Sequence, residues 1–376
     1  MNSAIFALNK KEKSDLKRKN FMNNIGLIDK LHRDKQLEGS EFLQLISTIS
    51  DDEMLYLHGI ARTVRRSTYG DRVFMRGLIE ISSYCKQNCL YCGLRAGNRN
   101  AQRYRLTSEQ ILAICDNGYS LGLRTFVLQG GEDSYFTDDL IVEIIRAIKG
   151  KFPDCAVTLS IGEKSKESYL RYYRAGGDRY LLRHETASDE LYSSLHPGLT
   201  FESRRQCLMN LKSIGFQTGA GFMVGLPRQT DEDLVKDILF LKELSPHMVG
   251  VGPFVPHGST PLATSSAGSA KKVALMLSIL RLMLPNVLLP ATTALGAVDN
   301  SHGQILALNA GANVLMPNLT PSEQRSKYRL YDGKTFVSDE ASECLGFMID
   351  RIRSIGLIPD MSRGDHRSVD SADSIC

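Results

Sequence analysis

Long apolar segments are absent from this sequence. No run of about 18 apolar residues occurs, which is the length that a membrane-spanning helix needs, so we expect no membrane partner. The apolar stretch at residues 1–8 is too short for a secretory signal and has no basic residue before it, so we expect no export.

Basic patches are also scarce. Residues 1–20 contain six Lys or Arg residues and two acids, which accounts for the whole net charge of +4 and leaves the rest of the chain neutral. We therefore expect no nucleic-acid partner and interpret residues 1–35 as a basic, mobile leader. The eight cysteines lack the spacing of a disulfide framework, which favours a reducing, cytoplasmic compartment.

Three of the cysteines stand together in a CxxxCxxC motif. Cys85, Cys89 and Cys92 follow an apolar run, residues 78–81, that is typical of a buried strand. Thiolates bind zinc and iron–sulfur clusters, and three protein ligands leave one iron of a 4Fe-4S cube open to a cofactor or substrate. Structural zinc would need a fourth ligand, but the next cysteine, Cys115, falls within a predicted helix. An open cluster in an anaerobic environment is favoured, with zinc or unligated thiols as the alternatives.

From residue 73 onward, apolar runs alternate with amphipathic helical segments. Strands are predicted at 73–81, 125–129, 156–161, 179–183, 217–222, 248–253, 287–291 and 313–316, with helices at 107–122, 138–149, 165–175, 201–214, 231–244, 270–284 and 304–309. Eight such repeats predict an α/β protein with a complete (β/α)8 TIM-type barrel over residues 73–318. Residues 36–72 are expected to form helices below the barrel, and residues 319–376 a C-terminal closing segment with a mobile tail.

Polar residues gather where the predicted strands end, which is where barrel active sites lie. They include Gln129, Gly131, Glu132, Ser160, Glu163, Arg183, Glu185, His257, Thr292 and Thr293. Gly131 would let the backbone approach a ligand, and Glu132 could accept from an ammonium group; a plain turn is the alternative. Arg183 and Glu185 alternate along a strand, so their side chains share one face, as ligand contacts or as a buried ion pair.

Other residues carry weaker signals. Arg204 opens a helix and either binds a carboxylate or is solvated. Arg76 lies at a depth that requires an anion or a buried partner. Thr158, Thr292 and Thr293 either bind a ligand or bond to the backbone. We expect Cys115, Cys155 and Cys207 to be buried apolar residues, and His196, His247 and His302 to be loop residues.

Longer strings resemble one family. They are residues 88–95 (NCLYCGLR), 103–106 (RYRL), 127–133 (VLQGGED), 178–187 (DRYLLRHETA), 219–227 (GAGFMVGLP), 252–257 (GPFVPH), 290–294 (PATTA) and 311–318 (GANVLMPN). Over about residues 70–335 the chain resembles the HydE family of FeFe-hydrogenase maturases, within the radical SAM superfamily. The resemblance implies an enzyme that helps to assemble the two-iron part of the hydrogenase active site.

The resemblance also implies ligands for particular residues. Cys85, Cys89 and Cys92 would hold one 4Fe-4S cluster; Gln129, Gly131, Glu132, Glu185, Arg204 and Met248 would contact S-adenosylmethionine; Arg76, Thr158, Arg179, Arg183, Thr292, Thr293 and Tyr328 would line the substrate cavity. The implied reaction adds a 5'-deoxyadenosyl radical to the sulfur of a small organometallic substrate, a cysteine-bound iron carbonyl and cyanide complex. Implied partners are an external low-potential electron donor, the tyrosine-cleaving radical SAM maturase and the GTPase scaffold maturase.

The sequence departs from some family members near its C-terminus. Where these carry three further cysteines for a second cluster, only Cys344 remains, and Phe336 and Phe347 align with the other two. We therefore expect one cluster. The alternatives are a mutase similar to methylornithine synthase, which would need an acidic partner for a substrate ammonium, and a non-catalytic iron–sulfur scaffold. A function similar to that of biotin synthase is less favoured, because it would need further cysteines at the strand ends and the sequence has none there.

Overall fold

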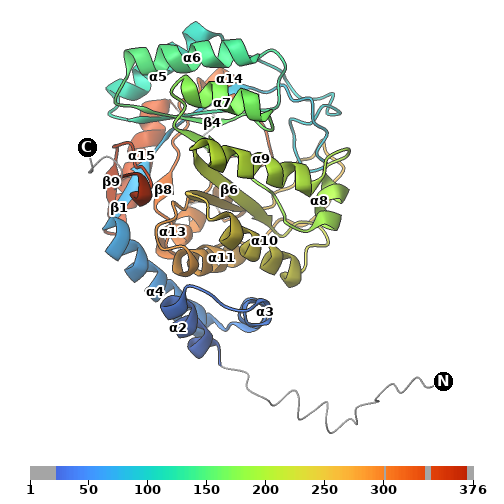
Figure 1. Ribbon diagram of the computed structural model, residues 1–376, viewed down its shortest axis with the longest axis vertical. Helices are drawn as coiled ribbons and strands as arrows, with labels where there is room; N and C mark the ends of the chain where they lie inside the picture. Colours follow the sequence, from blue (N-terminus) through green and yellow to red (C-terminus); the bar gives the residue numbers. More distant parts are fainter. Residues whose placement is uncertain (1–22, 300–301, 335–339, 371–376) are drawn as a thin grey trace, which may run out of the picture.

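Parallel strands form the wall of a barrel that helices surround (Figure 1). The structure, a computed structural model, describes residues 23–299, 302–334 and 340–370. Within these residues one sheet holds, in order, β2(Gly77–Ser82), β3(Thr125–Gly130), β4(Ala156–Ser160), β5(Arg179–Leu181), β6(Gln217–Val224) and β7(Met248–Pro253). A second sheet has β1(Arg72–Met75) between β8(Val314–Leu315) and β9(Ile358–Asp360).

The two sheets join into one closed ring. β1 continues into β2 through Arg76, and isolated bridges at Leu288 and Pro290 connect β7 to β8. The eight strand positions of the predicted barrel are therefore filled. Two details differ from the prediction. The first strand is divided at Arg76, and residues 287–291 contribute only bridges, in part because Pro290 has no N–H to donate to a ladder.

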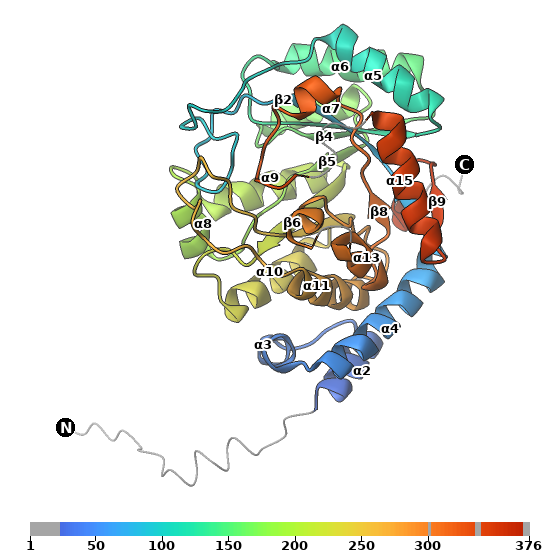
Figure 2. The ribbon, with the colours of Figure 1, turned by 180° about the vertical axis from the view of Figure 1, so that it is seen from behind.

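Helices follow the strands and cover the outside of the barrel (Figure 2). They are α5(Ser108–Ser120), α6(Asp138–Lys151), α7(Lys166–Arg174), α9(Phe201–Ile214), α10(Asp231–Leu244), α11(Ala270–Met283) and α13(His302–Asn309). Thr107 and Gln110 form the predicted capping box of α5. The short helices α8(Asp189–Leu195) and α12(Ala294–Val298) were not predicted. Among the helices formed by the described residues, none combines the length and apolar character that crossing a bilayer requires.

The N-terminal helices pack on the side of the barrel and not below it. α2(Asn24–Asp34), α3(Gly39–Thr48) and α4(Asp51–Tyr69) lie against α10 and α11 (Figure 1). α2 occupies part of the predicted mobile leader, because Leu27, Ile28 and Leu31 form a buried face that packs into the core. Residues 1–22 of that leader lie outside the described residues.

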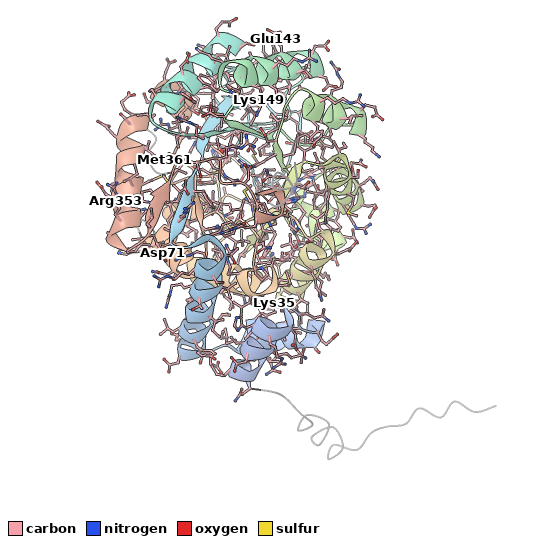
Figure 3. The ribbon with its side chains drawn as sticks, turned by 60° about the vertical axis from the view of Figure 1, so that its left-hand side comes forward. Lys35, Asp71, Glu143, Lys149, Arg353 and Met361 are labelled. Carbon is pink, nitrogen blue, oxygen red and sulfur yellow. The ribbon has the colours of Figure 1, made fainter. Side chains whose placement is uncertain are left out.

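The C-terminal segment closes the end of the barrel at which the strands begin. Figure 3 brings this end forward and labels Asp71 and Met361 there. The Ile358 amide donates to the Asp71 carbonyl at 2.8 Å, and β9 pairs with β1. After β9, the Asp365 carboxylate accepts hydrogen bonds from Gln217, Arg179 and Arg363. The expected mobile tail is therefore wrong for residues 360–368, since these contacts hold them; residues 371–376 lie outside the described part.

Candidate active site

The loop between β2 and α5 carries the three cysteines at the C-terminal end of the barrel. Arg103 organises this loop: its guanidinium donates to the carbonyl oxygens of Ser83, Leu94 and Arg95. These carbonyls stand on both arms of the loop, so Arg103 ties the arms together. The side-chain amide of Asn98 also donates a hydrogen bond, from Nδ2 to the Gly93 carbonyl at 2.7 Å. The thiols are thus presented by a braced loop.

The three thiols lie close enough to affect one another's ionisation. Burial raises the pKa of Cys85, and burial with the neighbouring Cys85 thiol raises that of Cys89 to about 12. Burial and then Cys89 raise the pKa of Cys92. Such thiols ionise readily only beside a cation, which a bound metal supplies. Cys115, the candidate fourth ligand for zinc, is buried inside α5, where burial and then Cys155 raise its pKa, so it belongs to the helix packing.

A cavity of about 280 Å³ opens beside the cysteine loop. Its wall consists of Cys89, Tyr91, Cys92, Gln129, Gly130, Ser160, Gly162, Leu181, Leu182, Arg183, Glu185, Arg204, Met223, Pro253, Phe254, Val255, Ala294, Tyr328, Leu330 and Tyr331. A largely apolar wall with a few charged groups is typical of a small-molecule site. A larger hollow, of about 700 Å³, lies over α6 and α7 but has no thiol in its lining.

Glu185 occupies a strained backbone position in the cavity wall. Its φ of 66° lies in the left-handed region that side-chain-bearing residues avoid. β6 holds it there: its amide donates to the Gly221 carbonyl and its carbonyl accepts from the Met223 amide, both at 3.0 Å. Arg183 Nη2 lies 3.2 Å from Glu185 Oε2 but donates to the Phe222 carbonyl, and Oε2 has no hydrogen-bond partner. The predicted ion pair therefore exists without a hydrogen bond between its partners, and both residues line the cavity.

A buried pair behind Glu185 anchors this turn. His184 Nε2 lies 3.2 Å from Asp237 Oδ1, and both side chains are fully buried. The Gly221 amide donates to His184 Nδ1 at 3.3 Å, so Nε2 carries the proton that Asp237 accepts. Asp237 Oδ1 also accepts from the Ala187 amide at 2.5 Å. Burial lowers the pKa of His184 and raises that of Asp237. The pair fastens residues 184–187 to α10 and so fixes the position of Glu185.

Arg204, from the first turn of α9, is buried and reaches the cavity. Its Nε donates to Glu163 Oε1 at 2.6 Å, and its Nη1 donates to the Arg183 carbonyl. Burial alone would lower the pKa of Arg204, but Tyr192 and Glu163 outweigh burial and raise it. The solvated alternative is therefore wrong, and the cavity contains a permanently charged guanidinium.

Gln129 and Gly131, at the end of β3 and in the loop after it, have different roles in the site. Gln129 lines the cavity and donates to the Tyr328 hydroxyl at 3.4 Å. Gly131 supports the cysteine loop instead, because a Cβ there would lie 2.2 Å from the Tyr84 carbonyl oxygen and 2.6 Å from the Cys85 Cβ. Only glycine permits this packing without displacing the backbone.

Glu132 does not line the cavity. It is buried, and its carboxylate accepts from Gln87 Nε2 at 2.7 Å and from the Glu163 amide at 3.1 Å. The carboxylate predicted to receive an ammonium group is therefore engaged between the cysteine loop and the loop after β4.

Tyr328 and Tyr331 complete the wall from the segment after β8. The Tyr331 hydroxyl pairs with Thr293 Oγ1 at 2.9 Å. Lys334 Nζ lies 2.6 Å from Glu80 Oε1 on β2 and donates to the Tyr328 carbonyl, which anchors the segment over the barrel. The pattern of strand ends could not have identified Tyr331, because this residue lies well beyond the end of β8 in the chain.

Three predicted ligand contacts lie away from this cavity. Arg76 is fully buried where the strands begin, with Nη1 3.0 Å from Met248 Sδ and Nη2 donating to the Gly364 carbonyl. Arg179 pairs with Asp365. Arg76, Arg179 and Met248 are thus held at the closed end, and a ligand role for them stays a prediction.

The threonines are also set back from the cavity lining. Thr158 is fully buried in β4 and its hydroxyl has no hydrogen-bond partner. Thr292 donates to the Val251 carbonyl at 3.4 Å, which is the backbone alternative. Thr293 reaches the site through Tyr331.

The predictions for His257 and His302 need correction, whereas His196 and His247 lie outside the helices and strands, as expected for loop residues. His257 borders a separate hollow of about 350 Å³ on the outer side of the cysteine loop, with Nε2 3.8 Å from Asp332 Oδ1. His196 is buried at the end of α8, and Tyr91 donates to its Nε2 at 2.9 Å because its Nδ1 faces the Tyr192 carbonyl. His302 begins α13. His247 lies in the turn before β7, as expected for a loop residue.

Two of the C-terminal positions compared with a second cluster lie on one helix and differ in exposure. Cys344 is buried in α15(Ala341–Ser354), whereas Phe347 is 46% exposed on the same helix. Phe336 lies outside the described residues.

The residues at the cavity fit a 4Fe-4S cluster and S-adenosylmethionine. Three neighbouring thiols on one short loop are the ligand set of a 4Fe-4S cube with one open iron. The Glu185 carboxylate in the cavity wall suits a donor such as an ammonium, and the guanidinium groups of Arg183 and Arg204 suit a carboxylate.

Comparisons with known proteins agree with this geometry. A family model described as the radical SAM superfamily matches residues 79–241. The chain is 45% identical over 313 residues, 83% of its length and 89% of the relative, to the [FeFe] hydrogenase maturase subunit HydE of Thermotoga maritima. It is 31% identical over 336 residues, 88% and 93% of the two chains, to 3-methylornithine synthase of Methanosarcina barkeri. The crystal structure of methylornithine synthase (PylB) matches with a TM-score of 0.77 at 27% identity and covers 93% of this chain and 100% of that one. The chain is therefore a radical SAM enzyme and belongs to the family of the [FeFe] hydrogenase maturase HydE.

Proposed function

We propose that this enzyme acts in the assembly of the two-iron part of the FeFe-hydrogenase active site. Its substrate is a small sulfur-bearing compound, a cysteine-bound iron complex with carbonyl and cyanide ligands. The observation that carries the proposal is the meeting, in one small cavity, of two motif thiols with Glu185 and two arginines. The 45% identity to HydE supports the same substrate class.

The proposed cofactors are one 4Fe-4S cluster on Cys85, Cys89 and Cys92, and S-adenosylmethionine beside it. When bound, they supply a 5'-deoxyadenosyl radical by one-electron cleavage of the sulfonium. The Glu185 carboxylate would accept hydrogen bonds from the amino group of the cofactor, and Arg204, which stays charged, would hold its carboxylate end.

The rest of the wall positions the substrate and excludes water. Leu181, Leu182 and Phe254 make the middle of the cavity apolar, which protects a reactive radical from solvent. Arg183 lines the cavity, and its buried Nε has no hydrogen-bond partner, so an anionic substrate could add to the pairing that Glu185 provides. The Tyr328 and Tyr331 segment covers this part of the cavity.

A second candidate function is that of a mutase similar to 3-methylornithine synthase, which the 31% identity favours. Lysine would need a carboxylate for its side-chain ammonium inside the barrel. Glu80 is the carboxylate on β2, and Lys334 of this chain already occupies it at 2.6 Å. The charge balance of the interior thus favours the sulfur-bearing anionic substrate.

Further proposals concern partners. We propose that the enzyme receives electrons from an external low-potential donor, and that it works beside the tyrosine-cleaving maturase and the GTPase scaffold. We also propose that a second cluster is not needed, since Cys344 is buried within α15.

The test is an anaerobic assay of the reconstituted and reduced protein that measures 5'-deoxyadenosine by chromatography. Release that rises with cysteine-derived thiols or thiazolidines, and not with lysine, supports the maturase. Stimulation by lysine instead supports the mutase. A bound cluster without any release under several reductants supports the non-catalytic scaffold.

A further inference from the structure

The outer face of the cysteine loop carries exposed aromatic and basic side chains. Tyr84, which directly precedes the first motif cysteine, is 37% exposed, and Tyr135 is 47% exposed. The Arg105 guanidinium lies 3.9 Å from the ring centre of Tyr84 and 5.0 Å from that of Tyr135. We call these three residues, with Lys86 and Arg103, the Tyr84 patch. Exposed tyrosines interleaved with arginine are typical of protein-binding surfaces.

Most of the Tyr84 patch lies in a segment of the chain whose charged residues are all basic. Residues 84–105 contain five basic residues and no acid: Lys86, Arg95, Arg99, Arg103 and Arg105. Two neighbouring carboxylates offset part of this charge: Asp133 pairs with Arg105 at 2.7 Å, and Glu132 lies 3.6 Å from Lys86. The three basic residues of the patch less these two carboxylates leave a charge of about +1, and Arg95 and Arg99 add two positive charges elsewhere in the segment. All the hydrogen bonds shown for Arg103 go to carbonyl oxygens, so its charge is not neutralised by them.

Several basic residues at the other end of the barrel, where the strands begin, form ion pairs with carboxylates. Arg363 pairs with both Asp178 and Asp365, Arg72 pairs with Asp360, and Arg124 pairs with Asp154. There, carboxylates of the chain itself pair with these three arginines. The described cysteine loop differs because its segment, residues 84–105, contains no acidic residue of its own.

We propose that the Tyr84 patch is the docking surface for a small acidic electron-carrier protein. The proposal rests on the proposed function, which consumes one electron from outside for each cleavage. Electron transfer slows steeply with distance, so a donor must dock over the cysteine loop, and Tyr84 is the neighbour of Cys85. The donor is oxidised by one electron and the enzyme is reduced by one; no bond forms or breaks. Charge complementarity steers a carrier of negative surface to this face.

The test measures the binding of an oxidised, acidic 4Fe-4S ferredoxin to the anaerobically reconstituted enzyme over a range of salt concentrations. The test variant combines Lys86→Gln, at a side chain 66% exposed, with Tyr135→Ala. The control combines Arg353→Gln on α15 with Tyr173→Ala on α7, which likewise removes one positive charge and one tyrosine ring at exposed positions elsewhere. We expect the dissociation constant of the test variant to rise about tenfold at low salt, with a shallower salt dependence, and that of the control to stay unchanged.

A second readout separates the docking surface from the chemistry. With dithionite as the reductant, which needs no docking, we expect both variants to release 5'-deoxyadenosine at the rate of the unaltered enzyme. No binding of ferredoxin by the unaltered enzyme, or equal weakening in both variants, would overturn the proposal. Patch-dependent binding in an enzyme that never cleaves S-adenosylmethionine would support the docking surface and overturn the proposed function.

Discussion

The two ends of the barrel treat their charged groups in opposite ways. Where the strands begin, the C-terminal segment closes the barrel, and its Asp365 carboxylate accepts hydrogen bonds from Arg179, Gln217 and Arg363. Where the strands end, Glu185 has a left-handed backbone and an oxygen without a hydrogen-bond partner. The charged groups of the closed end thus stabilise the fold, whereas the open end places a strained backbone and an ion pair without a hydrogen bond beside the cavity.

The largest effect should follow from changes at the open end that remove a cluster ligand. We expect Cys89→Ala to reduce 5'-deoxyadenosine release to background and to lower bound iron. The fold should remain, because Cys89 lies on a surface loop and is only partly buried. Iron analysis, circular dichroism and the release assay check this. Cys115→Ala is the control, and loss of iron in that variant would contradict the assignment of ligands.

At the closed end, the expected loss is in stability. Asp365→Asn leaves the buried Arg179 without its carboxylate and should lower the free energy of unfolding by about 3–5 kcal/mol at neutral pH. Asp332→Asn, at an exposed carboxylate, should have little effect. Chemical denaturation checks both variants. Equal stability of the Asp365 variant and the unaltered protein would mean that the closed end does not depend on this charge.

The same carboxylate predicts a pH dependence. Burial would raise the pKa of Asp365, but the Arg179 charge and the hydrogen bonds from Arg363 and Gln217 outweigh it and lower the pKa below its ordinary value of 3.8. Its contribution is then complete above the pKa of the unfolded chain and is lost as the pH falls through the folded pKa. The stability difference between the unaltered protein and Asp365→Asn should be constant from pH 7 to about pH 5 and shrink below about pH 4. A difference that grows on acidification would contradict this sign.

A change at Glu185 should separate stability from ligand binding. Glu185→Gly relieves the left-handed backbone by about 1 kcal/mol but leaves the partly exposed Arg183 without its carboxylate, so the free energy of unfolding should change little. It also removes the acceptor carboxylate, so affinity for S-adenosylmethionine should fall about 10- to 100-fold. Thermal unfolding and equilibrium binding of the cluster-loaded protein measure the two effects. Unchanged affinity would exclude Glu185 from the binding site.

The smallest effect is expected at the cover of the cavity. Tyr331→Phe removes the hydroxyl that pairs with Thr293 and should cost about 1 kcal/mol in stability, with a modest rise in KM. Tyr173→Phe, at an exposed hydroxyl on α7, serves as the control. A loss of turnover as large as that of the cysteine variant would show that Tyr331 takes part in the chemistry itself.

Local patterns predicted much of the fold. Apolar runs marked most barrel strands, and the capping box of Thr107 and Gln110 marked the start of α5. They failed at residues 287–291, where a proline interrupts the ladder, and at α2, whose buried face requires the neighbouring helices. Spacing alone identified Cys85, Cys89 and Cys92, since ligands of one cluster fall within one short loop.

The roles of individual polar residues depended on partners far away in the chain. The sequence by itself determined the barrel, the cysteine loop and the polar character of the strand ends, because each depends on residues near one another in the chain. Only the tertiary structure decided that Glu132 bonds to Gln87 and Glu163 whereas Glu185 keeps an oxygen unmatched. Likewise, only folding brought Asp365 to Arg179 and Tyr331 to Thr293. A charged side chain pairs with whichever group the fold places within about 3 Å of it, and the spacing of residues along the chain does not predict that distance.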